Sequence, residues 1–246
     1  MPISRLKCFP VTPVVALLSL ALLPQAARAQ AILGATSATT NMGSFFGSPN
    51  SLINQSGLSA TYTSGVTNFA TFTSTATHNF NSPAINTAGS ASWASGLGNK
   101  TGVVTFDMGS LVTLDKIAVW NWGGSDPVSL TGFNLFSDDN SSFTSATSLG
   151  SFTVDPNGAA FANPAQVFSF ASTTDRYFRM SITSNNGHSL FTGFGEVAFQ
   201  QGVSTPSSVT PELPGAMQLL PALLPVALIG ARKRFKNGAR KHFKKA

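Results

Sequence analysis

Short segments in which apolar and polar residues alternate fill the chain between about residues 31 and 201. Alternation with a period of two is typical of strands that bury one face, and no long stripe with the 3.6-residue period of a helix interrupts it. The segments "GVVTFDMG", "DKIAVWNW", "GFNLFSD", "QVFSFAS" and "RYFRMSIT" are the clearest. The residues predicted to share a face within a strand are Val104, Phe106 and Met108; Ile117 and Val119; Phe133 and Leu135; Phe168 and Phe170; and Phe178, Met180 and Ile182.

Turn signals separate these segments. "GGSDP", "DDNSS", "DPNG" and "SNNG" recur one or two dozen residues apart, which is the pattern that two packed antiparallel sheets require. The sequence therefore predicts an all-β sandwich over residues 30–201. The Thr- and Ser-rich stretch "ATYTSGVTNFATFTSTATHNF" is compatible with either a strand or a loop.

The first 29 residues have the pattern of a secretory signal peptide. A short basic start precedes an apolar stretch over 11–23, and "ARA" places a cleavage site after Ala29. Cys8 lies before the apolar stretch, so the mature chain contains no cysteine and offers neither a disulfide nor a thiolate ligand.

Three segments follow the predicted sandwich. A Ser/Thr/Pro linker covers 202–212, an uncharged and mostly apolar run covers 213–231, and a basic tail covers 232–246. Nineteen helical residues span about 28 Å, which is close to the thickness of the hydrocarbon core of a membrane. We expect a transmembrane helix whose basic tail stays on the cytoplasmic side.

This C-terminal arrangement resembles the PEP-CTERM sorting signal of bacteria. The motif is carried by Pro211, Glu212 and Pro214, and the basic residues Arg232, Lys233 and Arg234 follow the apolar run. The resemblance implies recognition by an exosortase-type enzyme. Leu213 is inserted into the motif and the tail is long, and a plain membrane anchor is the alternative.

Most of the basic residues lie at the two ends of the chain. Of 15 Lys and Arg, only four lie between residues 29 and 231, whereas all nine acidic residues lie in that interval. The predicted domain is therefore mildly acidic although the whole chain has a formal charge of +6. This distribution argues against nucleic-acid binding by the domain.

Five segments, in order, resemble the discoidin family, the coagulation factor V/VIII C-terminal type, whose fold is a galactose-binding-like jelly roll. They are "SASWASG", "VVTFDMGSLVTLDKIAVWNW", "LTGFNLFSDDNSSF", "DRYFRMSIT" and "GFGEVAF". The resemblance covers roughly residues 84–201. It implies a jelly-roll sandwich that binds carbohydrate, and it lacks the Asp-Gly-Asp segment that usually precedes the Trp, here Trp93.

Catalytic residues are not grouped in the sequence. The three histidines are scattered, and the adjacent Asp138 and Asp139 precede "NSS", as expected for a hairpin turn. We therefore expect no enzyme activity, and a hydrolase ranks last among the possible functions.

The discoidin resemblance also implies candidate ligands. Glu196 matches the glutamate that binds a structural calcium ion in many relatives; without calcium it would be a hydrogen-bonding or solvated residue. Sugar binding in the family uses end loops, where aromatic faces stack on a pyranose. The candidates are Trp122, His188, Asn185, His78 and Trp93.

For Trp93 and Trp120 we favour a core position over contact with a ligand. We expect Arg176 and Arg179 to pair with acidic residues of the sandwich, with the stem of Arg179 partly buried.

The sequence supports two functions from different classes. One is a secreted bacterial protein, sorted to the cell surface, whose domain binds exopolysaccharide or another cell-envelope glycan. The other is a structural component of the matrix or envelope without a discrete ligand site.

Overall fold

The computed structural model describes residues 30–80, 91–158 and 161–203 as a two-layered β sandwich. The predicted signal peptide (1–29), all but the first two residues of the predicted linker (202–212), the apolar segment 213–231 and the basic tail lie outside these residues. Within the described part of the chain, no helix has the length and apolar character needed to cross a bilayer.

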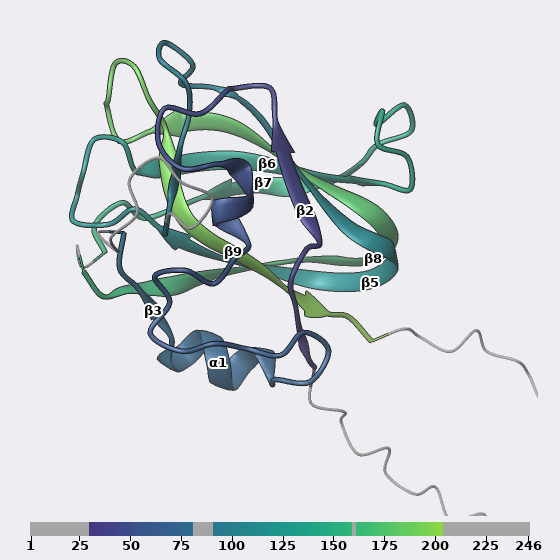
Figure 1. Cartoon of the computed structure of the whole chain (residues 1–246). Helices are drawn as coiled ribbons and strands as arrows, with labels where there is room; N and C mark the ends of the chain where they lie inside the picture. Colours follow the sequence, from purple (N-terminus) through teal and green to yellow (C-terminus); the bar gives the residue numbers. More distant parts are fainter. Residues whose placement is uncertain (1–29, 81–90, 159–160, 204–246) are drawn as a thin grey trace, which may run out of the picture.

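In the described residues, the domain contains nine strands and two short helices (Figure 1). The strands are β1 (Ile32–Leu33), β2 (Ser37–Thr40), β3 (Thr77–His78), β4 (Trp93–Ala94), β5 (Gly102–Asn121), β6 (Leu130–Asp138), β7 (Thr147–Thr153), β8 (Asn163–Asn185) and β9 (Gly193–Gln201). The helices are the 3-10 turn η1 (Pro49–Leu52) and α1 (Phe69–Thr75).

Two long strands, β5 and β8, run through both layers. In one layer, the first part of β5, up to Asp107, pairs with β2 and with the last part of β8, from Tyr177 onward. This last part of β8 also pairs with β6. The second part of β5 pairs with β9 and with the first part of β8. The two strands curve together at the right of Figure 1, so one antiparallel ribbon folds over and forms the centre of both sheets.

The fold-over lies at an interruption of the strand register. Asp107 pairs with Tyr177 and Val112 pairs with Asp175, so four residues of β5 lie opposite one residue of β8. Such a bulge bends a strand and increases its twist. Gly109, inside the bulge, has a φ of 81°, a conformation that glycine adopts without strain.

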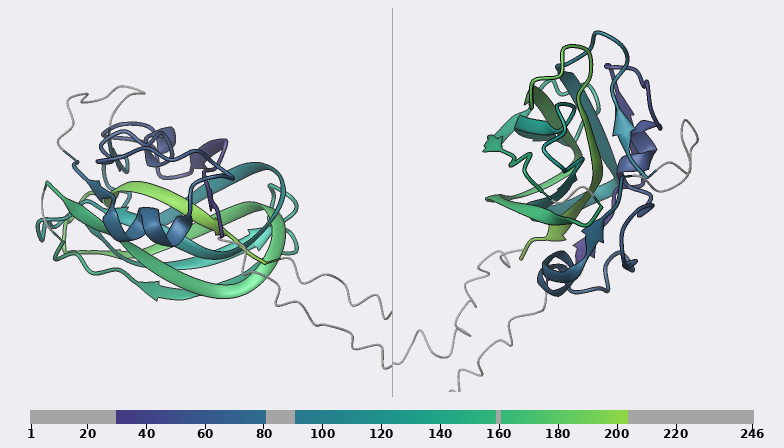
Figure 2. Two further views of the ribbon diagram at one scale, coloured as in Figure 1. Left: turned by 90° about the horizontal axis from the view of Figure 1, so that it is seen from below. Right: turned by 90° about the vertical axis from the view of Figure 1, so that its left-hand side faces the viewer.

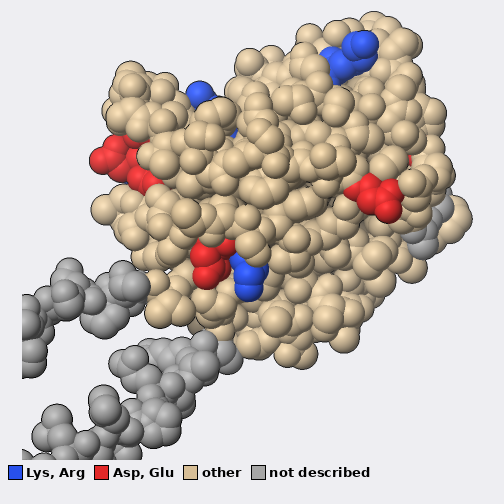
Figure 3. Space-filling view, turned by 180° about the vertical axis from the view of Figure 1, so that it is seen from behind, with Lys and Arg blue, Asp and Glu red and all other residues tan. Residues whose placement is uncertain are grey.

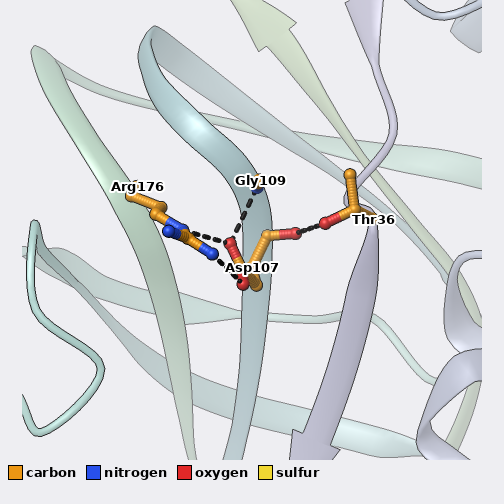
Figure 4. Close-up of polar contacts among 4 residues, drawn as sticks. All are labelled: Thr36, Asp107, Gly109 and Arg176. Atoms are coloured by element: carbon orange, nitrogen blue, oxygen red, sulfur yellow. Dashed lines mark hydrogen bonds and ion pairs between the residues drawn. The ribbon is translucent and has the colours of Figure 1, made fainter.

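Asp107 holds this bend together (Figure 4). Its carboxylate accepts two hydrogen bonds from the guanidinium of Arg176, at 2.8 and 2.9 Å, and one from the N–H of Gly109 at 2.7 Å. Its backbone carbonyl accepts two bonds from Thr36. The bonds from Arg176 lower the pKa of the Asp107 carboxyl below its usual value. The expected pairing of Arg176 with an acid is confirmed.

The alternating residues of the strands face the core between the two layers, as predicted. Val104, Phe106, Phe178 and Met180 come from one layer, and Ile117, Val119, Val197 and Phe199 come from the other; all are fully buried. The predicted sets around Phe133 and Phe168 pack against the same core. Burying a side chain of this size contributes about 1.5–3 kcal/mol.

A second, smaller core covers the outer face of β5 and β9. Ala118, Trp120 and Ala198 point away from the main core. They are buried by residues 30–80, which we call the N-terminal segment and which include Phe69 and Phe72 of α1. The indole N–H of Trp120 donates to the carbonyl of Ala76 at 2.9 Å. Figure 2 shows α1 and its connections lying against the outside of the sheet.

Helix α1 corrects the prediction of a strand or loop for residues 60–80. It spans only seven residues, which is too short to show a helical stripe in the sequence. Asn68 begins it, because its side chain accepts a hydrogen bond from the N–H of Thr71. Burial of Phe69 and Phe72 against Trp120 then stabilises a helix whose Thr-rich sequence has low intrinsic helix propensity.

Replacement of Gly109 by alanine tests the bend. A Cβ there would lie 3.0 Å from Thr36 Cγ2, and the positive φ adds strain, so we expect Gly109→Ala to lower the free energy of unfolding by about 1–3 kcal/mol in urea denaturation. Gly65→Ala is the matched control, because Gly65 also has a positive φ but no atom within 4 Å of its Cβ position. Equal losses in the two variants would contradict a special role for the bend.

Candidate functional site

Seven aromatic side chains gather in loops at one end of the sandwich. Because the β5–β8 ribbon folds over at residues 108–111, both ends of β5 and both ends of β8 lie at the opposite end of the domain. The loops that connect strands there carry the rings, which are Phe45, Phe46, Phe80, Trp122, Phe161, His188 and Phe191. They form two groups.

The first group, which we call the Phe45 stack, consists of Phe45, Phe191 and His188. The rings of Phe45 and Phe191 are 4.5 Å apart with an interplanar angle of 29°, and His188 stacks on Phe191 at 5.0 Å and 22°. Phe45 is 59% exposed although its ring is held in this stack. Exposed Leu97 and Leu190 belong to the adjoining loops. The stack therefore presents a fixed apolar face to solvent.

Hydrogen bonds within the loop between β8 and β9 set the position of Phe191. Nδ1 of His188 accepts from the N–H groups of Leu190 and Phe191, at 3.2 and 3.0 Å. The side-chain amide of Asn185 donates to the carbonyls of His188 and Phe191. Since Nδ1 is an acceptor, the neutral ring carries its proton on Nε2, which can donate to a ligand. Asn185, in contrast, uses its amide to shape the loop.

The second group, which we call the Trp122 stack, consists of Phe46, Trp122, Phe80 and Phe161. Phe80 stacks on Trp122 at 5.2 Å and 28° and on Phe161 at 5.9 Å and 12°. Phe46 meets Trp122 edge to face at 5.7 Å. Trp122 is half-buried, whereas Phe161 is 61% exposed.

Buried Asn121 positions Trp122 at the end of β5. Its side-chain oxygen accepts from the N–H groups of Trp122 and Leu130, and its side-chain nitrogen donates to the carbonyl of Leu130. The ring lies close to Gly193, where a Cβ would be 2.9 Å from the indole. Asn121 and Gly193 thus let the large ring lie against the backbone of β9.

Trp93 and His78, two of the sequence candidates, are buried and present no surface to a ligand. Trp93 packs against Phe194 in the main core, as expected, and its indole N–H donates to Ser44 beside the Phe45 stack. His78 lies in β3, near the end of the N-terminal segment, and its Nε2 is 2.7 Å from the carbonyl oxygen of Ala91. Burial lowers the pKa of His78 and favours its neutral form.

Glu196 is fully buried beneath the N-terminal segment. One carboxyl oxygen accepts from the N–H of Gln55 at 3.0 Å, and the other has no hydrogen-bond partner. Burial raises the pKa of this carboxyl well above its usual value, against the smaller opposing effect of the Gln55 N–H. Burial, and to a smaller extent the negative charge that Glu196 carries when ionised, raises the pKa of Tyr62. Burial therefore favours the protonated, neutral form of Glu196.

The calcium ion that the discoidin resemblance implies at Glu196 stays a prediction. The ion prefers six to eight oxygen ligands, but an N–H group points at one oxygen of this carboxyl. Among the residues that the structure describes, no three His, Cys, Asp or Glu side chains come together.

Asp138 ends β6, and Arg179 extends from β8 to the loop that follows β6. The carboxylate of Asp138 accepts from the N–H groups of Asn140 and Ser145, as expected for a turn residue. Arg179 was predicted to pair with an acid, but its main contacts are different. Its guanidinium lies 3.6 Å from the centre of the Phe143 ring, and its Nε–H donates to the hydroxyl of Thr105. Cation–π stacking is a common alternative partner for arginine.

A shallow hollow lies over β6, β7 and β8. It is lined by Thr131, Gly132, Phe133, Asn134, Ser151, Phe152, Thr153, Thr183 and Ser184. The ring of Phe133 is buried in the core, and the hydroxyls of Thr131 and Ser184 bond to one another. This hollow offers a ligand less exposed aromatic surface than the loop end does.

Sequence reasoning identified Trp122, His188 and Asn185 in these loops but missed the phenylalanines. None of these residues lies in an alternating apolar pattern: Phe80 is flanked by Asn and Phe161 by Ala, whereas Phe45 and Phe191 each have one large apolar neighbour in a Ser-, Gly- and Thr-rich loop. A large apolar residue in such a loop was the signal that could have marked them.

The pKa of Glu196 predicts a pH-dependent stability. In the unfolded chain a glutamate ionises near pH 4.3, whereas the buried carboxyl keeps its proton to higher pH. Its contribution is fully present below about pH 4.3 and decreases as the pH rises toward the folded pKa. We expect Glu196→Gln to gain stability over the wild type as the pH rises from 4 to 8 in thermal denaturation. Parallel stability curves for the two proteins would contradict burial of a protonated acid.

No protein-family model and no curated protein matches this chain. Among solved structures, it is similar to the CBM32 module of AlyQ in complex with 4,5-unsaturated mannuronic acid. The two sequences are 18% identical, the match covers 68% of this chain and 96% of that chain, and the TM-score is 0.45. It is also similar to the family 32 module of C. perfringens NanJ in complex with galactose, with 12% identity, 70% and 99% coverage and a TM-score of 0.47.

A chitosan-binding module from Paenibacillus sp. IK-5 is similar as well, with 14% identity, 68% and 95% coverage and a TM-score of 0.42. All three neighbours are carbohydrate-binding modules. The identities are too low to transfer any one ligand to this chain.

Proposed function

We propose that this chain is a carbohydrate-binding protein whose ligand stacks on the loop end of the sandwich. The observation that carries the proposal is the Phe45 stack, in which a ring that is 59% exposed is held by Phe191 and His188. A sugar ring offers an apolar face to an aromatic ring and hydroxyl groups to neighbouring donors. The Nε2–H of His188 is such a donor, since Nδ1 is engaged by the loop.

Rigidity supports this role of the stack. An aromatic side chain that is already fixed loses little conformational entropy when a ligand binds. Trp93 anchors Ser44 next to Phe45, and Asn185 fixes the carbonyls on both sides of the loop that carries Phe191. The loop end is therefore organised before any ligand arrives.

The protein binds without catalysing a reaction in this proposal. The adjacent acids Asp138 and Asp139 belong to a turn, where Asp138 is occupied by backbone N–H groups. Glu196 is enclosed under the N-terminal segment and has no exposed surface.

The terminal segments suggest where the domain acts. A signal peptide ending at Ala29 would export it, and the apolar run 213–231 with its basic tail would attach it to a membrane or present it to an exosortase-type enzyme. In this proposal the domain attaches to exopolysaccharide or another cell-envelope glycan.

Substitution of the exposed ring tests the binding proposal. We expect the purified full chain to bind at least one polysaccharide saturably in affinity electrophoresis, and Phe45→Ala to weaken binding about tenfold. Leu111→Ala is the control, because Leu111 is exposed to a similar degree, 61%, but lies in the bend. A folded wild type that binds no glycan would favour the structural matrix role, and equal binding by Phe45→Ala would exclude the stack.

Cell fractionation tests the location. With separate antibodies against the domain and the basic tail, we expect the domain in the envelope or surface fraction. Loss of the tail signal from that mature form indicates processing, and its retention indicates a permanent anchor. An intact, unprocessed chain in the cytosol would contradict the proposed export.

A further inference from the structure

The two aromatic stacks are built on the same piece of backbone. Phe45 and Phe46 are neighbours in the chain, and both of their N–H groups point to the carbonyl of Ala94. Phe45 belongs to one stack and Phe46 to the other. The segment from Phe191 to Gly193 joins them again, because Phe191 lies in the Phe45 stack and Gly193 contacts Trp122.

Each stack ends in an exposed ring. Phe45 ends the first, and Phe161 ends the second, where its ring is nearly parallel to Phe80 and that ring is backed by Trp122. A single sugar needs one such face. Two fixed faces on adjoining loops suit a ligand that repeats the same apolar face along its length, as a polysaccharide does.

The charges around the stacks restrict the class of polysaccharide. In the described parts of the loops that carry the rings, the acidic residues are Asp126 and Asp155, and each carboxylate accepts a backbone N–H of its own loop. Lys100 is the basic residue of the neighbouring loop. With two acids and one lysine in these loops, a polyanion is disfavoured, since like charges on a ligand and its site repel.

The rest of the visible surface agrees with this restriction. Figure 3 shows one face of the domain on which uncharged residues predominate and the few Lys, Arg, Asp and Glu side chains are scattered. Such a surface contains no basic stripe that could follow an acidic polymer.

We propose that the Phe45 and Trp122 stacks together form one extended surface that binds a neutral polysaccharide over several sugar units. The inference rests on the proposed carbohydrate binding and adds the size and the charge of the ligand. Phe45 holds one part of the polymer and Phe161 holds another part.

Calorimetry with oligosaccharides of increasing length tests the inference. The probes are neutral galacto- and chito-oligosaccharides (the latter N-acetylated) of one to six units and, as an acidic series, alginate oligosaccharides, all titrated into the full chain. For the neutral series that binds, we expect affinity to rise about tenfold or more between one and six units, since a second stacking contact adds about that factor. The acidic series should bind more weakly at every length.

Two variants separate the stacks. Phe161→Ala should remove the gain of about tenfold for the hexamer and leave the affinity for the monosaccharide unchanged, whereas Phe45→Ala should weaken both. Val66→Ala, which truncates an apolar side chain that is 75% exposed before α1, is the control and should change neither. Circular dichroism verifies that each variant is folded.

The outcomes distinguish the inference from the proposed function. Saturable binding without a length dependence, or with an unchanged hexamer affinity in Phe161→Ala, would overturn the extended surface and leave carbohydrate binding intact. Tighter binding of alginate than of the neutral series would overturn the charge assignment. A folded wild type that binds none of the probes would overturn both proposals.

Discussion

The folding-over of the β5–β8 ribbon is the constraint on which the rest of the structure depends. Because the two strands stay paired on both sides of the bend, each contributes its alternating apolar residues to both layers, and these residues close the main core. The bend requires a break in register, which Asp107, Gly109 and Arg176 stabilise. No disulfide is needed, since the buried apolar side chains supply the cohesion.

The same constraint positions the candidate site. Folding the ribbon brings the start and the end of β5 to one end of the domain, so loops that are far apart in the sequence meet there. Polar groups of three side chains then fix those loops: Asn121 at Trp122, Asn185 at Phe191 and the indole of Trp93 at Ser44. The exposed aromatic rings are therefore held by the fold rather than by a ligand, which is the property that the proposed carbohydrate binding requires.

Much of the sandwich could be predicted from the sequence because alternation is a local signal. Val104 and Phe106, like Ile117 and Val119, lie on the faces that the pattern assigned. Three features could not be predicted. Helix α1 is too short to show a period, the bend depends on the pairing of Asp107 with a residue 69 positions away, and the phenylalanine stacks depend on loops that only the folded topology brings together.

The central claim is that ligand contacts lie at the loop end of the sandwich, and backbone amide shifts in NMR spectra test it most directly. The experiment records spectra of the ¹⁵N-labelled chain while a glycan that binds is added. The account predicts that the largest shifts occur at Phe45, Trp122 and Phe191, with little change at the bend around Gly109. Shifts centred on the hollow over β6 and β7, around Thr131 and Ser151, would contradict it.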